Sequence, residues 1–132
     1  KNPDGLAATA IEEFLRFDAP LHLFERTATA DTQIGGVEIK SGQKIASLLG
    51  SANRDEAHFA SADQMDITRD PNPHIGFGAG IHFCLGGPLA RLEMGIALPK
   101  LVKAFPEMKM ASDPIRRPTF VLRGYEKVEI SS

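Results

Sequence analysis

The sequence predicts an α+β fold with two main helices, a small antiparallel sheet and a long meandering loop. Two segments, residues 6–17 and 88–105, carry apolar residues at helical spacing. Residues 21–49 show the pattern of strands separated by turn residues. Residues 50–75 have little periodicity and are rich in Asp, Asn, Ser and Pro, which indicates an irregular connection. The length fits one domain, predicted over residues 1–132.

The first helix is predicted from Leu6 to Phe17. Asn2 is a suitable N-cap, Pro3 suits the first helical position, and Pro20 stops the helix. The apolar stripe comprises Leu6, Ala7, Ala10, Ile11, Phe14 and Leu15, while Glu12, Glu13 and Arg16 lie largely off it.

Glycine-containing turns delimit the predicted strands. Residues 26–29 precede a hairpin over residues 33–39, whose turn is Gly35-Gly36. Ser41-Gly42 marks another turn before the strand over residues 44–49. These segments predict the small antiparallel sheet.

The C-terminal third begins with a second helix, which Pro88 opens and which runs roughly to Phe105. Pro99 lies inside this helix and is expected to kink it or end it early. Residues 119–122 and 127–130 alternate enough to predict a second hairpin.

Composition excludes several classes of function. The net charge is −2, with acids and bases mixed along the chain, so no nucleic-acid partner is expected. No apolar run approaches the roughly 20 residues that a membrane-spanning helix needs. The N-terminus lacks the pattern of a secretory signal, and a cytoplasmic location is the default expectation. The single cysteine rules out an intrachain disulfide.

Residues 76–93 carry the strongest functional signal. Five glycines surround the single cysteine, Cys84, which stands at the start of the second predicted helix. Backbone N–H groups and the helix dipole favour a thiolate there. Glycines allow backbone amides and a flat cofactor to approach the sulfur closely, and Phe77 is placed to restrict water.

This stretch resembles the haem-binding signature of cytochrome P450s, Phe-x-x-Gly-x-[basic]-x-Cys-x-Gly. The matching positions are Phe77, Gly80, His82, Cys84 and Gly86, and residues 90–93, Ala-Arg-Leu-Glu, resemble the start of the family's next helix. The resemblance extends from Leu6 to the final hairpin. It implies the C-terminal portion of the cytochrome P450 fold, in the style of a soluble bacterial member.

A second resemblance lies in the first helix. Glu13-Phe14-Leu15-Arg16 is similar to the family's Glu-x-x-Arg, and residues three apart share a helix face. In the family this pair joins a third arginine and braces the fold behind the haem. Arg69 is the first candidate for that arginine, and Arg54 is the alternative.

The resemblance implies haem b as cofactor, with Cys84 as the iron ligand and catalytic residue. The implied cofactor contacts are Arg26, Phe77, Gly78, His82, Cys84 and Gly86. Arg26 and His82 would pair with the two haem propionates.

The implied activity is insertion of one oxygen atom into a small apolar substrate, with electrons from a ferredoxin-type partner. Residues 21–24 and the final hairpin near Phe120 and Val121 would face the substrate. Arg91 and residues 100–103 would form a basic docking surface for the acidic partner.

Simpler interpretations compete with each assignment. A lone cysteine is most often a small buried hydrophobe. A nucleotide loop would need glycine at Ile81 to complete G-x-G-x-x-G, and a zinc site would need ligands that the chain does not cluster. Arg26 could instead be an exposed strand arginine, and Glu13 and Arg16 could form a surface ion pair. Arg91 and residues 100–103 could belong to a solvated helix face. The alternative for the histidines is an ordinary loop or surface position (His22, His58 and His74).

The family's oxygen-activating helix and the roof of its substrate pocket have no counterpart in the sequence. The expectation is therefore a fragment of a full enzyme, a truncated gene product or, less favoured, a standalone module. A non-catalytic chain that self-associates through exposed apolar surface is the second class of function considered. A peroxide-using haem-thiolate enzyme is the third.

Overall fold

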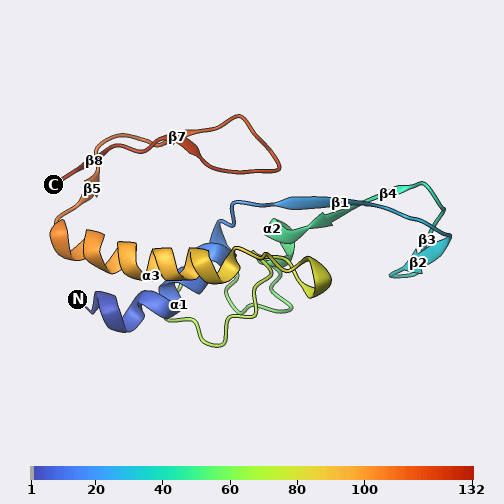
Figure 1. Cartoon of the computed structure of the whole chain (residues 1–132), viewed down its shortest axis with the longest axis horizontal. Helices are drawn as coiled ribbons and strands as arrows, with labels where there is room; N and C mark the ends of the chain where they lie inside the picture. The colour runs from blue at the N-terminus through green and yellow to red at the C-terminus, as the bar shows by residue number, and fades with distance from the viewer. Residues whose placement is uncertain (1) are drawn as a thin grey trace.

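The computed structural model describes residues 2–132 and confirms an α+β arrangement (Figure 1). The helices are α1 (Pro3–Phe17), α2 (Leu49–Ala52), the short 3₁₀ helix η1 (Gly80–His82) and α3 (Gly87–Ala104). The strands are β1 (Leu23–Thr27), β2 (Thr32–Ile34), β3 (Val37–Ile39), β4 (Lys44–Leu48), β5 (Lys109–Met110), β6 (Ile115–Arg116), β7 (Tyr125–Lys127) and β8 (Ile130–Ser131). Figure 1 shows α1 and α3 packed together, with β1 to β4 extending from them as an arm.

Helix α1 begins at Pro3, the residue predicted for the first helical position, and so includes residues before the predicted Leu6–Phe17 segment. The side-chain Oδ1 of Asn2 accepts a hydrogen bond from the backbone N–H of Gly5 at 3.2 Å, which confirms the predicted cap. At the other end, the N–H of Asp18 donates to the carbonyl of Phe14 at 3.2 Å. The helix therefore ends before Pro20, as expected.

The arm consists of two antiparallel pairs, β1 with β4 and β2 with β3. Gly35 and Gly36 connect β2 to β3 with φ angles of 58° and 82°, a left-handed backbone that favours glycine. The predicted Gly-Gly hairpin is confirmed. Within β1, Arg26 stands opposite Ile45 of β4.

The core is small and lies where α1 meets the irregular segment after α2. Its buried apolar residues are Ala10, Ile11, Leu15, Ala19, Leu49, Phe59 and Ala62. The buried Asn53 anchors this segment, because its Oδ1 accepts a hydrogen bond from the backbone N–H of Ile75 at 2.8 Å. Apart from α2, residues 50–75 form turns and bends, as the sequence predicted.

Helix α3 continues past Pro99 to Ala104, close to the predicted end at Phe105, so the proline does not end the helix early, which was one of the two effects expected of it. Pro99 is buried and, with Leu6 and Ala10 of α1, lines an apolar cavity of about 370 Å³ between the helices. Packing of α3 on α1 thus offsets the backbone hydrogen bond that proline cannot make. No helix within residues 2–132 is both long and apolar enough to cross a membrane.

The C-terminal hairpin is formed by β6 and β7, so the predicted pairing of residues 119–122 with 127–130 is wrong. Residues 119–122 lie at the tip between β6 and β7 and not in a strand of that pair. The tip instead pairs with the segment after α1: the N–H of His22 donates to the carbonyl of Val121 at 3.0 Å, and the N–H of Arg123 donates to that of Pro20 at 2.7 Å. Tertiary pairing therefore outweighed the local alternation.

Candidate functional site

Cys84 lies in the turn between η1 and α3, with its side chain exposed. Its backbone N–H donates to the carbonyl of Phe77 at 2.9 Å, and its carbonyl accepts from the N–H of Gly87 at 3.1 Å. These bonds close the loop and place the sulfur directly before the first turn of α3.

The glycines of this loop differ in why a side chain is disfavoured at each position. Gly78 and Gly80 have φ angles of 74° and 60°, where an L side chain is strained. A Cβ at Gly87 would lie 3.4 Å from both the Phe77 and Phe83 rings, so these rings pack against bare backbone. At Gly86, a Cβ would make only an ordinary 3.8 Å contact with the Cys84 sulfur.

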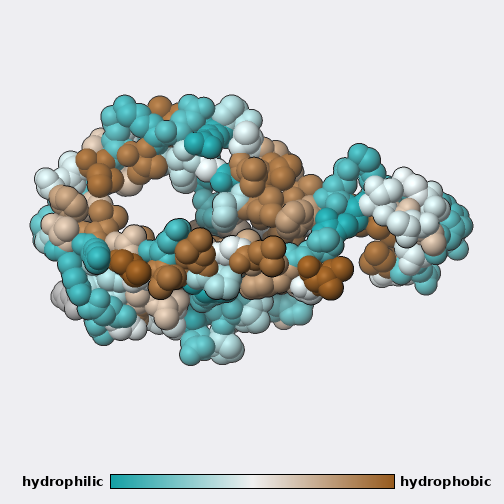
Figure 2. Space-filling view, in the orientation of Figure 1, coloured by the Kyte–Doolittle hydropathy of each residue, from teal (hydrophilic) through white to brown (hydrophobic). Residues whose placement is uncertain are grey.

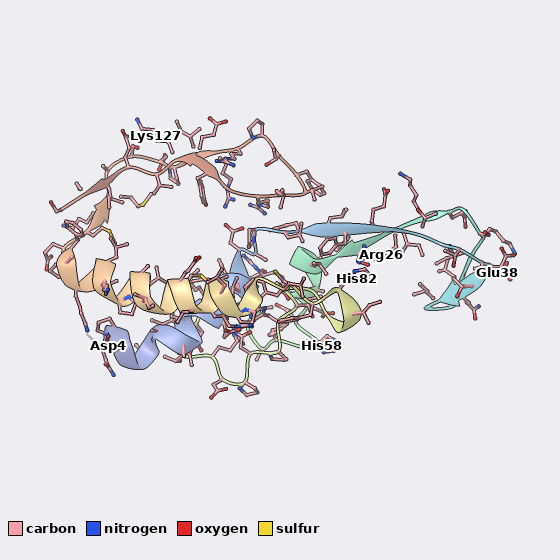
Figure 3. All side chains as sticks on the ribbon, viewed as in Figure 1. Asp4, Arg26, Glu38, His58, His82 and Lys127 are labelled. Carbon is pink, nitrogen blue, oxygen red and sulfur yellow. The ribbon has the colours of Figure 1, made fainter. Side chains whose placement is uncertain are left out.

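Arg26 and His82, the predicted partners of the propionates, come from β1 and from η1 (both labelled in Figure 3). Arg26 is exposed; its Nη1 donates to its neighbour's carbonyl, that of Glu25, at 2.9 Å, and its guanidinium lies 5.3 Å from the Phe24 ring centroid. His82 is exposed at the end of η1. Within residues 2–132, no carboxylate forms an ion pair with either side chain, so both basic groups are available to an acidic ligand.

Glu13 and Arg16 form a buried pair rather than the surface ion pair considered as an alternative. Arg16 donates to the two carboxylate oxygens of Glu13 at 2.7 and 2.8 Å, and neither side chain is exposed. Arg69 joins them through a 3.2 Å contact between its Nε and Oε2 of Glu13. The predicted third arginine is thus Arg69, whereas Arg54 binds the carbonyl of Phe17.

The surroundings of Glu13 explain its ionisation. Burial alone would raise the pKa of its carboxyl, but the hydrogen bonds from Arg16 and from the N–H of Asp66, with the charges of Arg16 and Arg69, lower that pKa from 4.5 to about 2. Asn72 adds a further bond, from Nδ2 to Oε2 of Glu13, at 3.0 Å. Sequence analysis missed Asn53 and Asn72, because an Asn in a segment without periodicity gives no local signal of burial.

His74 corrects the expectation of an ordinary loop or surface histidine, since its side chain is only 2% exposed. Its Nε2 lies 2.8 Å from Oε2 of Glu12. Arg91 of α3 donates to the same carboxylate at 2.6 and 2.8 Å, so it is not the free docking charge that the sequence predicted. Lys103 is likewise paired, with Asp4 at 2.6 Å.

The two segments predicted to face a substrate lie side by side, since Leu21 bridges to Leu122. Phe120 and Val121, at 74% and 44% exposed, present apolar surface at this hairpin tip. Figure 2 shows further apolar side chains along α3, edging the open space between α3 and the C-terminal strands. Around the cysteine, Ile81 and Leu85 are almost fully exposed. Within residues 2–132, no three His, Cys, Asp or Glu residues form a group that could hold a metal ion.

Comparison with known proteins decides the family. The family model described as Cytochrome P450 matches residues 6–126. The chain belongs to the cytochrome P450 family. It is 55% identical over 107 residues to the putative cytochrome P450 YjiB of Bacillus subtilis, covering 81% of this chain and 27% of that protein. It is 42% identical over 123 residues to the steroid C26-monooxygenase of Rhodococcus jostii, covering 92% and 26%.

Solved cytochrome P450 structures share the fold described above. The crystal structure of P450BioI in complex with a hexadec-9Z-enoic acid ligated acyl carrier protein superimposes with a TM-score of 0.94 at 43% identity. The match covers 98% of this chain and 34% of that one. The chain therefore spans between about a quarter and a third of the length of these relatives.

Membership of this family implies a haem cofactor, and the residues around Cys84 fit one. Cys84 is exposed, so its sulfur is accessible to an iron. Ile81 and Leu85 offer apolar surface, and Arg26 and His82 offer basic groups to the acidic edge of a haem. A haem-thiolate site thus agrees with the chemistry of the available donors.

Proposed function

We propose that this chain supplies the thiolate side of a cytochrome P450 monooxygenase, in which Cys84 would hold the iron of haem b. The observation that carries the proposal is the exposed Cys84 in a closed loop at the start of α3, within a chain that matches the family over residues 6–126. When bound, haem supplies the activation of oxygen, and a thiolate ligand favours O–O cleavage.

The chain's own residues have separate tasks under this proposal. Arg26 and His82 bind the two propionates, and Phe77 restricts water near the sulfur. Gly78 and Gly86 provide the close backbone approach that the ligand loop needs. The buried Glu13, Arg16 and Arg69 hold the segments behind the loop together.

The proposed reaction is insertion of one oxygen atom into a small apolar substrate. The pairing of Leu21 and His22 with the hairpin tip supports a role for these segments in substrate contact, because it brings the half-buried residues 21–24 beside the exposed apolar side chains of Phe120 and Val121. The relative from Rhodococcus jostii, named a steroid monooxygenase, also supports this class of reaction.

Electrons would come from a ferredoxin-type partner. Arg91 is paired with Glu12 and Lys103 with Asp4, so Lys100 would contribute more to docking than either.

The exposed apolar side chains of α3, Leu89, Leu92 and Ile96, support self-association of the isolated chain as an accompanying property. A cytoplasmic setting suits such a donor and stays part of the proposal.

The proposal is tested by titrating the chain with haemin, reducing it, adding carbon monoxide and recording the absorption spectrum. The expected result is the Soret band of thiolate-ligated ferrous–CO haem, lost in Cys84→Ala. His82→Ala is the matched control, because it removes the nearest histidine but leaves the thiolate, and the band should keep its position. Absence of haem uptake, or a band that survives Cys84→Ala, would contradict the proposal.

A further inference from the structure

The carboxylate of Glu12 joins three segments that are distant in sequence. Its Oε1 and Oε2 accept hydrogen bonds from Nε and Nη2 of Arg91 in α3 at 2.6 and 2.8 Å. Its Oε2 also lies 2.8 Å from Nε2 of His74, in the irregular segment. Hydrogen bonds from Arg91, the largest cause, lower the pKa of Glu12, so the carboxylate that holds this cluster is charged.

The second ring nitrogen of His74, Nδ1, binds the residue that precedes Phe77 in the cysteine loop. The backbone N–H of Gly76 donates to Nδ1 of His74 at 3.0 Å, so Nδ1 is an acceptor and the proton lies on Nε2, facing Glu12. Gly76 itself has no space for a side chain, since a Cβ would lie 2.6 Å from the carbonyl oxygen of Leu15. The loop is therefore fixed against α1 immediately before Phe77.

Arg91 contacts Phe77 as well. Its guanidinium lies 4.8 Å from the centroid of the Phe77 ring, and the His74 ring centroid lies 6.5 Å from it. The carbonyl of Phe77 accepts the N–H of Cys84 at 2.9 Å. The contacts of Glu12 with His74 and with Arg91 therefore both lead to Phe77, whose carbonyl binds the backbone N–H of Cys84.

We propose that His74 and Arg91, joined by Glu12, are positioning residues that hold Phe77 and, through it, the backbone amide of Cys84. The inference rests on the proposed function only for its consequence, a stable bond between the Cys84 sulfur and iron. Neither His74 nor Arg91 touches the cofactor in this role. Their effect passes through the ring and carbonyl of Phe77.

Amide hydrogen exchange of the full chain, followed by NMR without haem, tests the positioning directly. His74→Asn keeps an acceptor near Gly76 but no longer reaches Glu12, and Arg91→Met removes the cation while keeping an apolar stem. Each variant should exchange the Cys84 amide about fivefold faster, or more, relative to the Asp18 amide at the end of α1, the effect of losing roughly one hydrogen bond. Taking the ratio to Asp18 removes any contribution from global unfolding.

Lys103→Met is the matched control, because it breaks another ion pair between α1 and α3, with Asp4, away from the cysteine loop. It should leave the ratio unchanged. With haem bound, part of the ferrous–CO Soret absorption of the two test variants should lie at the position of haem without a thiolate ligand. The spectrum of the control variant should match that of the wild type. An unchanged exchange ratio in both test variants would overturn the inference, even if haem binds normally. A wild-type chain that takes up no haem would overturn the proposed function instead, and the exchange test would still be valid.

Discussion

The carboxylate of Glu13 and the guanidinium of Arg16 meet through two hydrogen bonds, at 2.7 and 2.8 Å, with neither side chain exposed to solvent. Arg16 also donates to the backbone carbonyls of Asn53 and Ala62, each at 2.8 Å. The pair therefore joins α1 to a segment that has little regular structure of its own. Loss of this pair should therefore lower the stability of the whole fold.

Glu13→Gln should lower the free energy of unfolding by about 3 to 5 kcal/mol, because it leaves Arg16 buried without its counter-charge. Chemical denaturation monitored by circular dichroism measures this. Asp63→Asn is the control: Asp63 is 80% exposed and pairs with Arg54 at 3.1 Å, so its loss should cost less than about 1 kcal/mol. Equal losses in the two variants would show that the buried pair is not special.

The low pKa of Glu13 predicts how stability depends on pH. Its pKa is about 2 in the fold against an ordinary value of 4.5, so the folded chain binds fewer protons here than the unfolded chain. The contribution, about 3 kcal/mol, is complete above about pH 5 and is lost as the pH falls toward 2. Unfolding free energies measured across this window should fall more steeply for the wild type than for Glu13→Gln, and parallel curves would refute the assignment.

Two glycines with different surroundings should respond in opposite directions to alanine. Gly76→Ala should destabilise the chain, because the new Cβ would lie 2.6 Å from the carbonyl oxygen of Leu15, which is backbone and cannot easily move. Gly95→Ala, inside α3, places its Cβ 3.9 Å from Ile11, an ordinary contact, and should stabilise the chain by up to about 1 kcal/mol. Thermal melts of the two variants check the signs.

The sequence predicted the parts of this site that depend on local rules. The cap at Asn2, the Gly35-Gly36 turn and the cysteine before α3 each follow from residue type and spacing over a few positions. The pairing of Glu13 with Arg16 also followed from helical spacing, although its burial did not. Arg69 was predicted only through the resemblance to cytochrome P450s.

Contacts between distant segments could not be predicted in the same way. His74 lies 62 positions from Glu12, and nothing around it in the sequence distinguishes it from a surface histidine. The tip near Val121 was assigned to a strand because of its alternation, but its carbonyl bonds to His22, about 100 positions earlier. Pro99 was expected to kink α3 or end it early, yet α3 continues to Ala104 because it packs against α1.

The exposed guanidinium of Arg26 should contribute to haem affinity through charge. Arg26→Gln should weaken haemin binding severalfold, because it removes the cation but keeps a side chain able to donate hydrogen bonds. The difference from wild type should shrink at high salt, where exposed charges are screened. Arg117→Gln, on the C-terminal hairpin, is the control. Identical haemin affinities for Arg26→Gln and wild type at low salt would remove Arg26 from the site.

X-ray absorption at the iron edge of the haem-loaded chain decides whether the Cys84 sulfur binds the haem iron. The expected result is a sulfur neighbour in the first coordination shell of the wild type, replaced by a lighter atom in Cys84→Ser. A first shell of nitrogen and oxygen alone in the wild type would show that the sulfur does not bind the iron. The loop before α3 would then carry the family's motif without forming its metal bond in this chain.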